Sequence, residues 1–94
     1  FMDSGQAEQI FKKLKDQIGS TCLNANEFYL GDEGCKILAD YLKLNGSFVK
    51  IIDLKGNNIS GQGILHLTPY LKSTNSLTRL SLEWNSLGQS HIGI

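Results

Sequence analysis

The sequence predicts an α/β fold of repeated strand–turn–helix units, with parallel strands and one helix in each unit. The first observation is an internal repeat, because residues 49–59 (VKIIDLKGNNI) return 28 positions later as residues 77–87 (LTRLSLEWNSL). The second is that apolar and polar residues alternate in both copies, which is typical of short strands with one buried face. The third is that apolar residues recur at helical spacing over residues 32–44 and 63–72.

Residues 4–19 are interpreted as an N-terminal cap. It is expected to be an amphipathic helix over residues 4–18, with Gly19 as its C-cap. Asp3 and Gln6 have the spacing of a capping box. The apolar residues share one helical face: Ile10, Phe11, Leu14 and Ile18. Such a helix would cover the open first end of a stack of repeats. The alternative is a basic amphipathic helix that binds a membrane or a partner helix.

Residues 20–48 are interpreted as a degraded first repeat. Leu23, Ala25 and Leu30 take the apolar places of the template, and Phe28 stands where the later copies have asparagine. A helix is expected over residues 32–44, with these residues inward: Cys35, Leu38, Tyr41 and Leu42. Gly46 follows as a residue that tolerates positive φ.

Residues 49–76 form the best-preserved repeat. A strand is expected over residues 49–54, a turn over 59–61, and a helix over 63–72 with Ile64, Leu67 and Leu71 inward. Pro69 predicts a kink or a broken first half of this helix, because proline removes a donor and clashes one turn back.

Residues 77–94 form a partial third repeat whose helix barely begins at residues 89–94. Its strand is left without a following repeat to cover it. We therefore expect a piece of a longer array or, as the alternative, a short protein whose last strand packs on a second copy or another chain.

Asn57 and Asn85 recur where the chain leaves a strand and turns. Their side-chain amides are predicted to satisfy buried backbone groups of their own and the neighbouring turn. This is a structural role, so neither asparagine is a candidate for catalysis.

The pattern resembles the ribonuclease-inhibitor-like class of leucine-rich repeats over residues 20–94. These residues carry the resemblance: Val49, Ile52, Leu54, Asn57, Ile59, Gly63, Leu67 and Leu71. The resemblance implies a short horseshoe-shaped solenoid with strands on the concave face and helices on the convex face. It also implies a protein-binding module, as in ribonuclease inhibitor, immune-receptor sensors, tropomodulin and the Ran GTPase-activating protein. Fold alone does not choose among these functions.

The outward positions of the strands line up as columns across the predicted sheet. An exposed tryptophan beside paired charges is typical of a protein-binding hot spot. The candidate partner-binding residues are therefore Ile51, Asp53, Lys55, Arg79, Glu83 and Trp84. The alternative is that Trp84 packs on its neighbours or on a missing repeat, and that the charged residues form a solvated face.

Composition and motifs limit the function further. Nine basic and nine acidic residues give zero net charge, which provides no electrostatic case for nucleic acid or an anionic membrane. His66 and His91 have no partner at metal-ligand spacing, and residues 61–63 are too short for a phosphate loop. We predict no enzyme, no metal and no cofactor.

Cys22 and Cys35 are too few for a disulfide framework, and the first residues lack the pattern of a signal peptide. Both observations favour an intracellular protein of the cytoplasm. The predicted function is a non-catalytic module that binds another protein through the concave face or the open C-terminal end. The alternative is an oligomerising segment of a larger scaffold, and regulation of a GTPase or enzyme is a third, weaker hypothesis.

Overall fold

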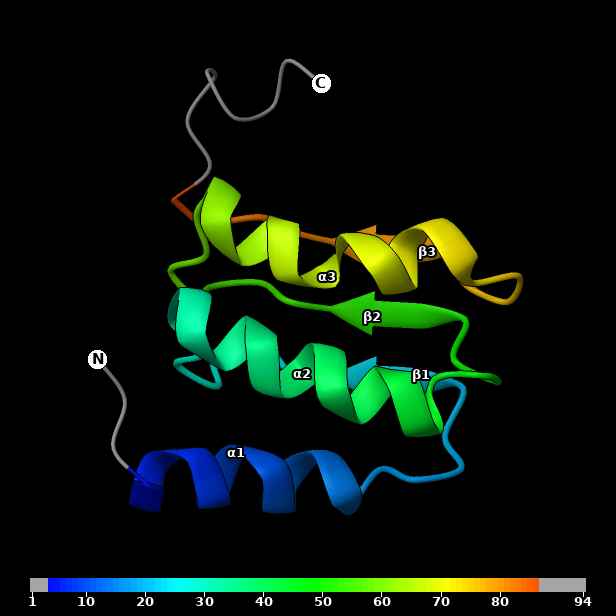
Figure 1. Cartoon of the computed structure of the whole chain (residues 1–94), viewed down its shortest axis with the longest axis horizontal. Coiled ribbons are helices and arrows are strands. Elements are labelled where there is room, and N and C mark those ends of the chain that lie inside the picture. Colours follow the sequence, from blue (N-terminus) through cyan, green and yellow to red (C-terminus); the bar gives the residue numbers. More distant parts are fainter. Residues whose placement is uncertain (1–3, 87–94) are drawn as a thin grey trace.

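The computed structural model describes residues 4–86, in which helices and strands alternate along the chain (Figure 1). The elements in order are α1 (Ser4–Lys15), β1 (Cys22–Asn24), α2 (Gly31–Asn45), β2 (Ile51–Asp53), α3 (Gly61–Ser73) and β3 (Arg79–Ser81). The helices lie side by side in chain order, and the strands follow the same order. None of the helices in this part of the chain is long and apolar enough to cross a membrane.

The three strands form one parallel sheet in the order β1-β2-β3. Leu23, Ile52 and Leu80 are aligned in one row, as the repeat alignment predicts. The rows on either side of it point away from the helices, since strand side chains alternate between the two faces. We call this side the outer sheet face.

The core lies between the sheet and the helices and contains the inward residues that the template predicts. From the first two repeats it includes Leu23, Ala25, Leu30, Cys35, Leu38, Tyr41, Leu42, Val49, Ile52, Leu54, Ile59 and Leu67. Ile64 and Leu71 pack against it and are half-buried. In the third repeat, Leu77, Leu80 and Leu82 are also only half-buried.

The capping helix buries a narrower face than predicted. Ile10 and Leu14 are buried in the core, but Phe11 and Ile18 are exposed. Ile18 is not part of the buried helical face because α1 ends at Lys15 and the chain continues in turns. Phe11 lies beside the buried stripe, with the Lys15 ammonium 5.4 Å from its ring centroid. The capping box at Asp3 lies outside the described residues.

Gly46 ends α2 for a reason other than the predicted one. Its φ is −92°, which any residue can adopt, so positive φ is not what requires glycine here. A Cβ at Gly46 would instead approach the Leu42 carbonyl oxygen to 2.5 Å and a ring carbon of Tyr70 to 2.6 Å. The position requires a residue without a side chain because Tyr70 packs on the main chain.

Pro69 does not break α3, which is one helix from Gly61 to Ser73. Proline leaves the carbonyl of Leu65 without its usual donor. Both Leu65 and Pro69 are exposed, so solvent can hydrate that carbonyl. The helix begins two residues earlier than predicted, because the Ser60 side chain accepts a hydrogen bond from the Gln62 N–H and caps it.

The first edge of the sheet is covered by a side chain. The Gln17 amide accepts a hydrogen bond from the Asn24 N–H and donates one to the Asn24 carbonyl, both at 2.8 Å. The side chain thus takes the place of a neighbouring strand along β1. The helix predicted to begin at residue 89 lies outside the described residues.

Candidate protein-binding surface

Asn57 holds the turn between β2 and α3 against the turn of the preceding repeat. Its Oδ1 accepts a hydrogen bond from the Leu30 N–H (3.2 Å), and its Nδ2 donates to the carbonyls of Ala25 (2.8 Å) and Leu54 (3.0 Å). The side chain is buried, with 1% of its surface exposed. It therefore satisfies main-chain groups that have no access to water.

Asn85 makes the same bonds one repeat later. Its Oδ1 accepts from the N–H groups of Asn57 (3.0 Å) and Ile59 (2.9 Å), and its Nδ2 donates to the carbonyls of Leu54 (2.8 Å) and Leu82 (3.0 Å). Phe28 occupies the equivalent place in the first repeat, where no earlier repeat offers main-chain groups to satisfy. The Lys13 ammonium lies 5.1 Å from the centroid of the Phe28 ring.

These asparagines fix the side of the molecule where strands pass into helices. We call it the strand-to-helix edge and define it as residues 26–29, 55–58 and 83–86. Hydrogen bonds from the Glu27 N–H to the Lys55 carbonyl (2.9 Å) and from the Gly56 N–H to the Glu83 carbonyl (3.0 Å) continue the strand pairing into it. Side chains on this edge are therefore stacked at the repeat offset.

The turns at this edge require left-handed backbone. Glu27 (φ 55°), Gly56 (φ 69°) and Trp84 (φ 61°) occupy equivalent positions in the three repeats. Only glycine adopts such a φ without steric strain, so Glu27 and Trp84 are held there by the surrounding turn. Strained residues of this kind gather at functional sites, and they draw attention to Trp84.

Trp84 is the most prominent side chain on the edge. It is 79% exposed, and the Lys55 ammonium lies 5.3 Å from its ring centroid, within the range of a cation–π contact. The main chain of Lys55 is held by its turn, because the Asp53 Oδ1 accepts a hydrogen bond from the Lys55 N–H (3.0 Å). An exposed aromatic ring is thus presented beside a positive charge.

Gly56 leaves a gap in the column between Glu27 and Trp84. A Cβ at Gly56 would lie 3.1 Å from the Glu27 Cγ, so the Glu27 side chain leans across the glycine. The edge therefore offers a negative charge, a bare main chain and an indole ring in adjacent repeats.

The candidate residues do not all lie together. Asp53, Lys55, Glu83 and Trp84 gather toward the ends of their strands, whereas Ile51 and Arg79 pair at the beginning of β2 and β3. Arg79 is the first residue of β3, whereas Trp84 lies in the turn that follows this strand. Arg79 is exposed and Ile51 is half-buried between Cys22 and Arg79.

Sequence reasoning did not identify Tyr29, which belongs to the same edge. It is 83% exposed and has a left-handed φ of 58°, and the equivalent Asn58 has a φ of 55°. Gly56 and Asn58 were the available signals, because glycine and asparagine are the residues that most readily adopt this conformation. Together they mark two left-handed positions in the second repeat.

The perturbed pKa values belong to Cys35, Asp32 and Tyr41, none of which is a candidate partner-binding residue. Burial, assisted by the charge of Asp32, raises the pKa of the Cys35 thiol to about 12. Burial alone would raise the pKa of Asp32. Hydrogen bonds from the Ser60 hydroxyl, the Ser60 N–H and the Gly63 N–H, together with the electrostatic effect of His66, outweigh the effect of burial. The net result is a lowered pKa of Asp32. Within residues 4–86, no three His, Cys, Asp or Glu side chains are grouped as metal ligands.

The chain is similar to leucine-rich repeat-containing protein 45 of Gallus gallus, with 46% identity over 59 residues. The match covers 63% of this chain and 9% of the relative, so the chain corresponds to a small part of that protein. No family model matches the chain. The match supports a leucine-rich repeat relationship, in agreement with the mixed helix and strand fold and its parallel sheet.

Proposed function

We propose that this chain is a non-catalytic protein-binding segment, built as a short leucine-rich repeat solenoid of the ribonuclease-inhibitor-like class. The partner would contact the outer sheet face, which is the concave side of such a solenoid, together with the adjoining strand-to-helix edge, or the open C-terminal end. The observation that carries the proposal is Trp84, an exposed indole held in left-handed backbone beside the Lys55 ammonium.

Tryptophan suits this role because burying its ring removes about 150–250 Å² of surface from water at little entropic cost. Glu83 and Asp53 place negative charge near Lys55, which would set the orientation of a partner more than its affinity. Ile51 and Arg79 extend the surface toward the beginning of the strands. The two free cysteines, one exposed and one buried, accord with a cytoplasmic setting.

The test compares Trp84→Ala with Leu65→Ala, which removes another exposed apolar side chain, from α3. Both variants and the unmodified chain are immobilised, and the proteins that each retains from a cell extract are quantified. Partner proteins should be retained by the unmodified chain and by Leu65→Ala. We expect Trp84→Ala to retain them no longer. Equal retention by all three, with circular dichroism showing intact folds, would contradict the proposal.

A second candidate function is an oligomerising segment of a larger scaffold. Leu77, Leu80 and Leu82 support it, because they are half-buried where Val49, Ile52 and Leu54 of the preceding repeat are buried. Sedimentation over a concentration series separates the two, and a strict monomer at high concentration rules out the second. Regulation of a GTPase or another enzyme rests on the family resemblance alone.

A further inference from the structure

The side of the molecule opposite Trp84 has a different character. The three connections that lead from helices back to strands stack there, at residues 16–21, 46–50 and 74–78, as Figure 1 shows. Hydrogen bonds from the Lys50 N–H to the Thr21 carbonyl and from the Thr78 N–H to the Lys50 carbonyl, both 2.7 Å, tie them together. We call this side the helix-to-strand edge, and we include in it the last helical turns.

Positive charge is concentrated on this edge although the chain as a whole is neutral. Each helix has a lysine in its last turn: Lys15, Lys43 and Lys72. Lys50 directly precedes β2, and Arg79, which follows the third connection, is the first residue of β3. Asp16 is the acidic residue of these connections in the described chain. The strand-to-helix edge, by contrast, carries the acidic residues Glu27 and Glu83 together with one basic residue, Lys55.

Helix dipoles account for only part of this pattern. Lysine is favoured near a helix C-terminus because it interacts with the unpaired carbonyls, which explains Lys15, Lys43 and Lys72. Lys50 and Arg79 are outside the helices, so the dipole does not require them.

Exposed apolar side chains lie among the lysines. Ile18 (56% exposed), Leu44 (80%) and Phe48 (74%) belong to the end of α2 and to the connections on this edge. None of these three side chains is buried in the core. Val49, which follows Phe48, and Leu42, two residues before Leu44, are both buried. Apolar groups of this size beside several cations are typical of an interaction surface.

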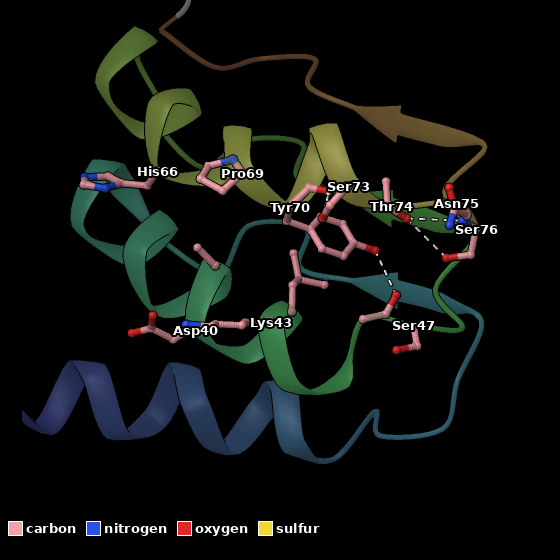
Figure 2. A pocket seen from close by; sticks show the side chains of 13 residues that line it. Asp40, Lys43, Ser47, His66, Pro69, Tyr70, Ser73, Thr74, Asn75 and Ser76 are labelled. Atoms are coloured by element: carbon pink, nitrogen blue, oxygen red, sulfur yellow. Dashed lines mark hydrogen bonds between the residues drawn. The ribbon is translucent and has the colours of Figure 1, made fainter.

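A groove between α2 and α3 opens onto the same edge. Its volume is about 620 Å³, which is within the range of ligand-binding pockets. Figure 2 shows the Tyr70 ring in the groove, held by a hydrogen bond from its hydroxyl to the Gly46 carbonyl (3.0 Å). Ala39, Leu42 and Pro69 add apolar surface, and Ser47, Asn75 and Ser76 surround the mouth with polar groups.

We propose that the groove and the helix-to-strand edge bind an acidic segment of another protein that carries an apolar anchor residue. The anchor enters the groove against Tyr70. The acidic residues of the segment lie over Lys43 in the wall of the groove and over Lys50 and Lys72 beyond it. They avoid Asp40, whose carboxylate in the same wall repels them. This contact is separate from the surface around Trp84 and does not depend on it.

The groove is what favours a peptide over a lipid surface. A membrane contacts protruding side chains, whereas a concave space with hydrogen-bonding groups at its mouth fits a side chain on an extended backbone. A second copy of this chain would have to present Glu27 and Glu83 to the lysines, which would join molecules head to tail. The experiment separates all three occupants.

The probe is a fluorescein-labelled peptide with one phenylalanine flanked on both sides by glutamates, and its binding to the full chain is followed by fluorescence anisotropy. We expect saturable binding that weakens with salt, since exposed charges are screened. A peptide with serine in place of phenylalanine should bind about tenfold more weakly, and one with lysines in place of glutamates should not bind. Equal binding of all three peptides, or no saturable binding of the first, would overturn the proposal.

Protein variants locate the contact. The double variant Lys43→Glu/Lys50→Glu and the groove-filling Asn75→Trp should each weaken binding about tenfold or more. Lys36→Glu makes the same kind of charge reversal at one position of α2 away from the edge and should bind like the unmodified chain, as should Trp84→Ala. If the double variant binds as well as Lys36→Glu, the assignment of this edge is wrong.

Two further measurements address the other occupants. Co-sedimentation with phosphatidylcholine vesicles that contain phosphatidylserine, lost in the double variant, would assign the edge to a membrane instead. Salt-sensitive self-association without peptide, also lost in the double variant, would assign it to a second copy. The proposal requires that neither occurs at the concentrations at which the peptide binds.

Discussion

Replacing Asn57 by alanine is the most direct test of how the repeats are held together. The substitution removes the acceptor of the Leu30 N–H and the donor to the Ala25 carbonyl, both in the preceding repeat. Leu30 and Ala25 are buried, so water cannot replace the lost partners without opening the turn. The Leu30 N–H is therefore left without its partner at the boundary between repeats, and the Ala25 carbonyl keeps only the longer hydrogen bond from the Phe28 N–H (3.3 Å).

The expected cost follows from these two changes. A buried donor left unpaired costs about 1–3 kcal/mol and a lost hydrogen bond at a group that keeps another partner about 1 kcal/mol, so we expect Asn57→Ala to lower the free energy of unfolding by about 2–4 kcal/mol. A domain of this length is stable by roughly 5–14 kcal/mol in total. The substitution should therefore remove a large share of the stability and leave a marginal fold.

The assay is urea unfolding followed by circular dichroism, with Asn85→Ala and Asn75→Ala as matched variants. Asn85 makes equivalent bonds but is half-buried, so water can replace part of them and the loss should be smaller. Asn75 is exposed in the connection after α3, and its truncation should change stability by less than about 0.5 kcal/mol. Amide exchange at Leu30 should accelerate in Asn57→Ala alone.

The reasoning would be refuted if Asn57→Ala and Asn75→Ala unfolded at the same urea concentration with equal slopes. It would also fail if Asn85→Ala cost more than Asn57→Ala, since burial is what gives the inner asparagine its larger effect.

Three other predictions concern single side chains. Because the pKa of Asp32 is lowered on folding, its carboxylate contributes stability that is complete above pH 3.8 and is lost as the pH falls through the lower folded-state value. Asp32→Asn should therefore be less stable than the unmodified chain at pH 7, by about 1–2 kcal/mol, with a gap that closes below pH 3.8 in urea titrations. Burial raises the pKa of Cys35, so at pH 8 a disulfide reagent should modify one thiol per native chain, that of Cys22, and both in denaturant. Finally, Trp84→Gly should be more stable than Trp84→Ala by about 1 kcal/mol in thermal melts, because only glycine relieves the left-handed φ; the reverse order would mean that the turn is not strained.

The arrangement of the sheet could be predicted because it follows from the repeat alone. An offset of 28 or 29 residues aligns Leu23, Ile52 and Leu80, and the observed register is the same. The hydrogen bonds of Asn57 follow likewise from its place after a strand. Such features depend on spacing, and spacing is visible in the sequence.

The features that escaped prediction depend on local three-dimensional crowding. Gly46 is required by the approach of Tyr70, which lies 24 residues away in the chain. Pro69 is tolerated because the affected carbonyl belongs to an exposed residue. Glu27 and Trp84 adopt left-handed backbone against their own preference, and Gly56 alone in their column signals the requirement.

The bonds of the turns also determine how the molecule opens. Asn57, Asn85 and Asp32 each bind main-chain groups of an adjacent repeat, so a repeat that separates from its neighbour leaves both with unpaired groups. The cooperative unit of opening is then the boundary between two repeats instead of a single repeat. A partner that binds at Trp84 in the third repeat would stabilise the closed boundary between the second and third repeats. Its binding free energy would therefore appear as slower amide exchange in the second repeat, at Asn57 and Ile59, which the partner need not touch.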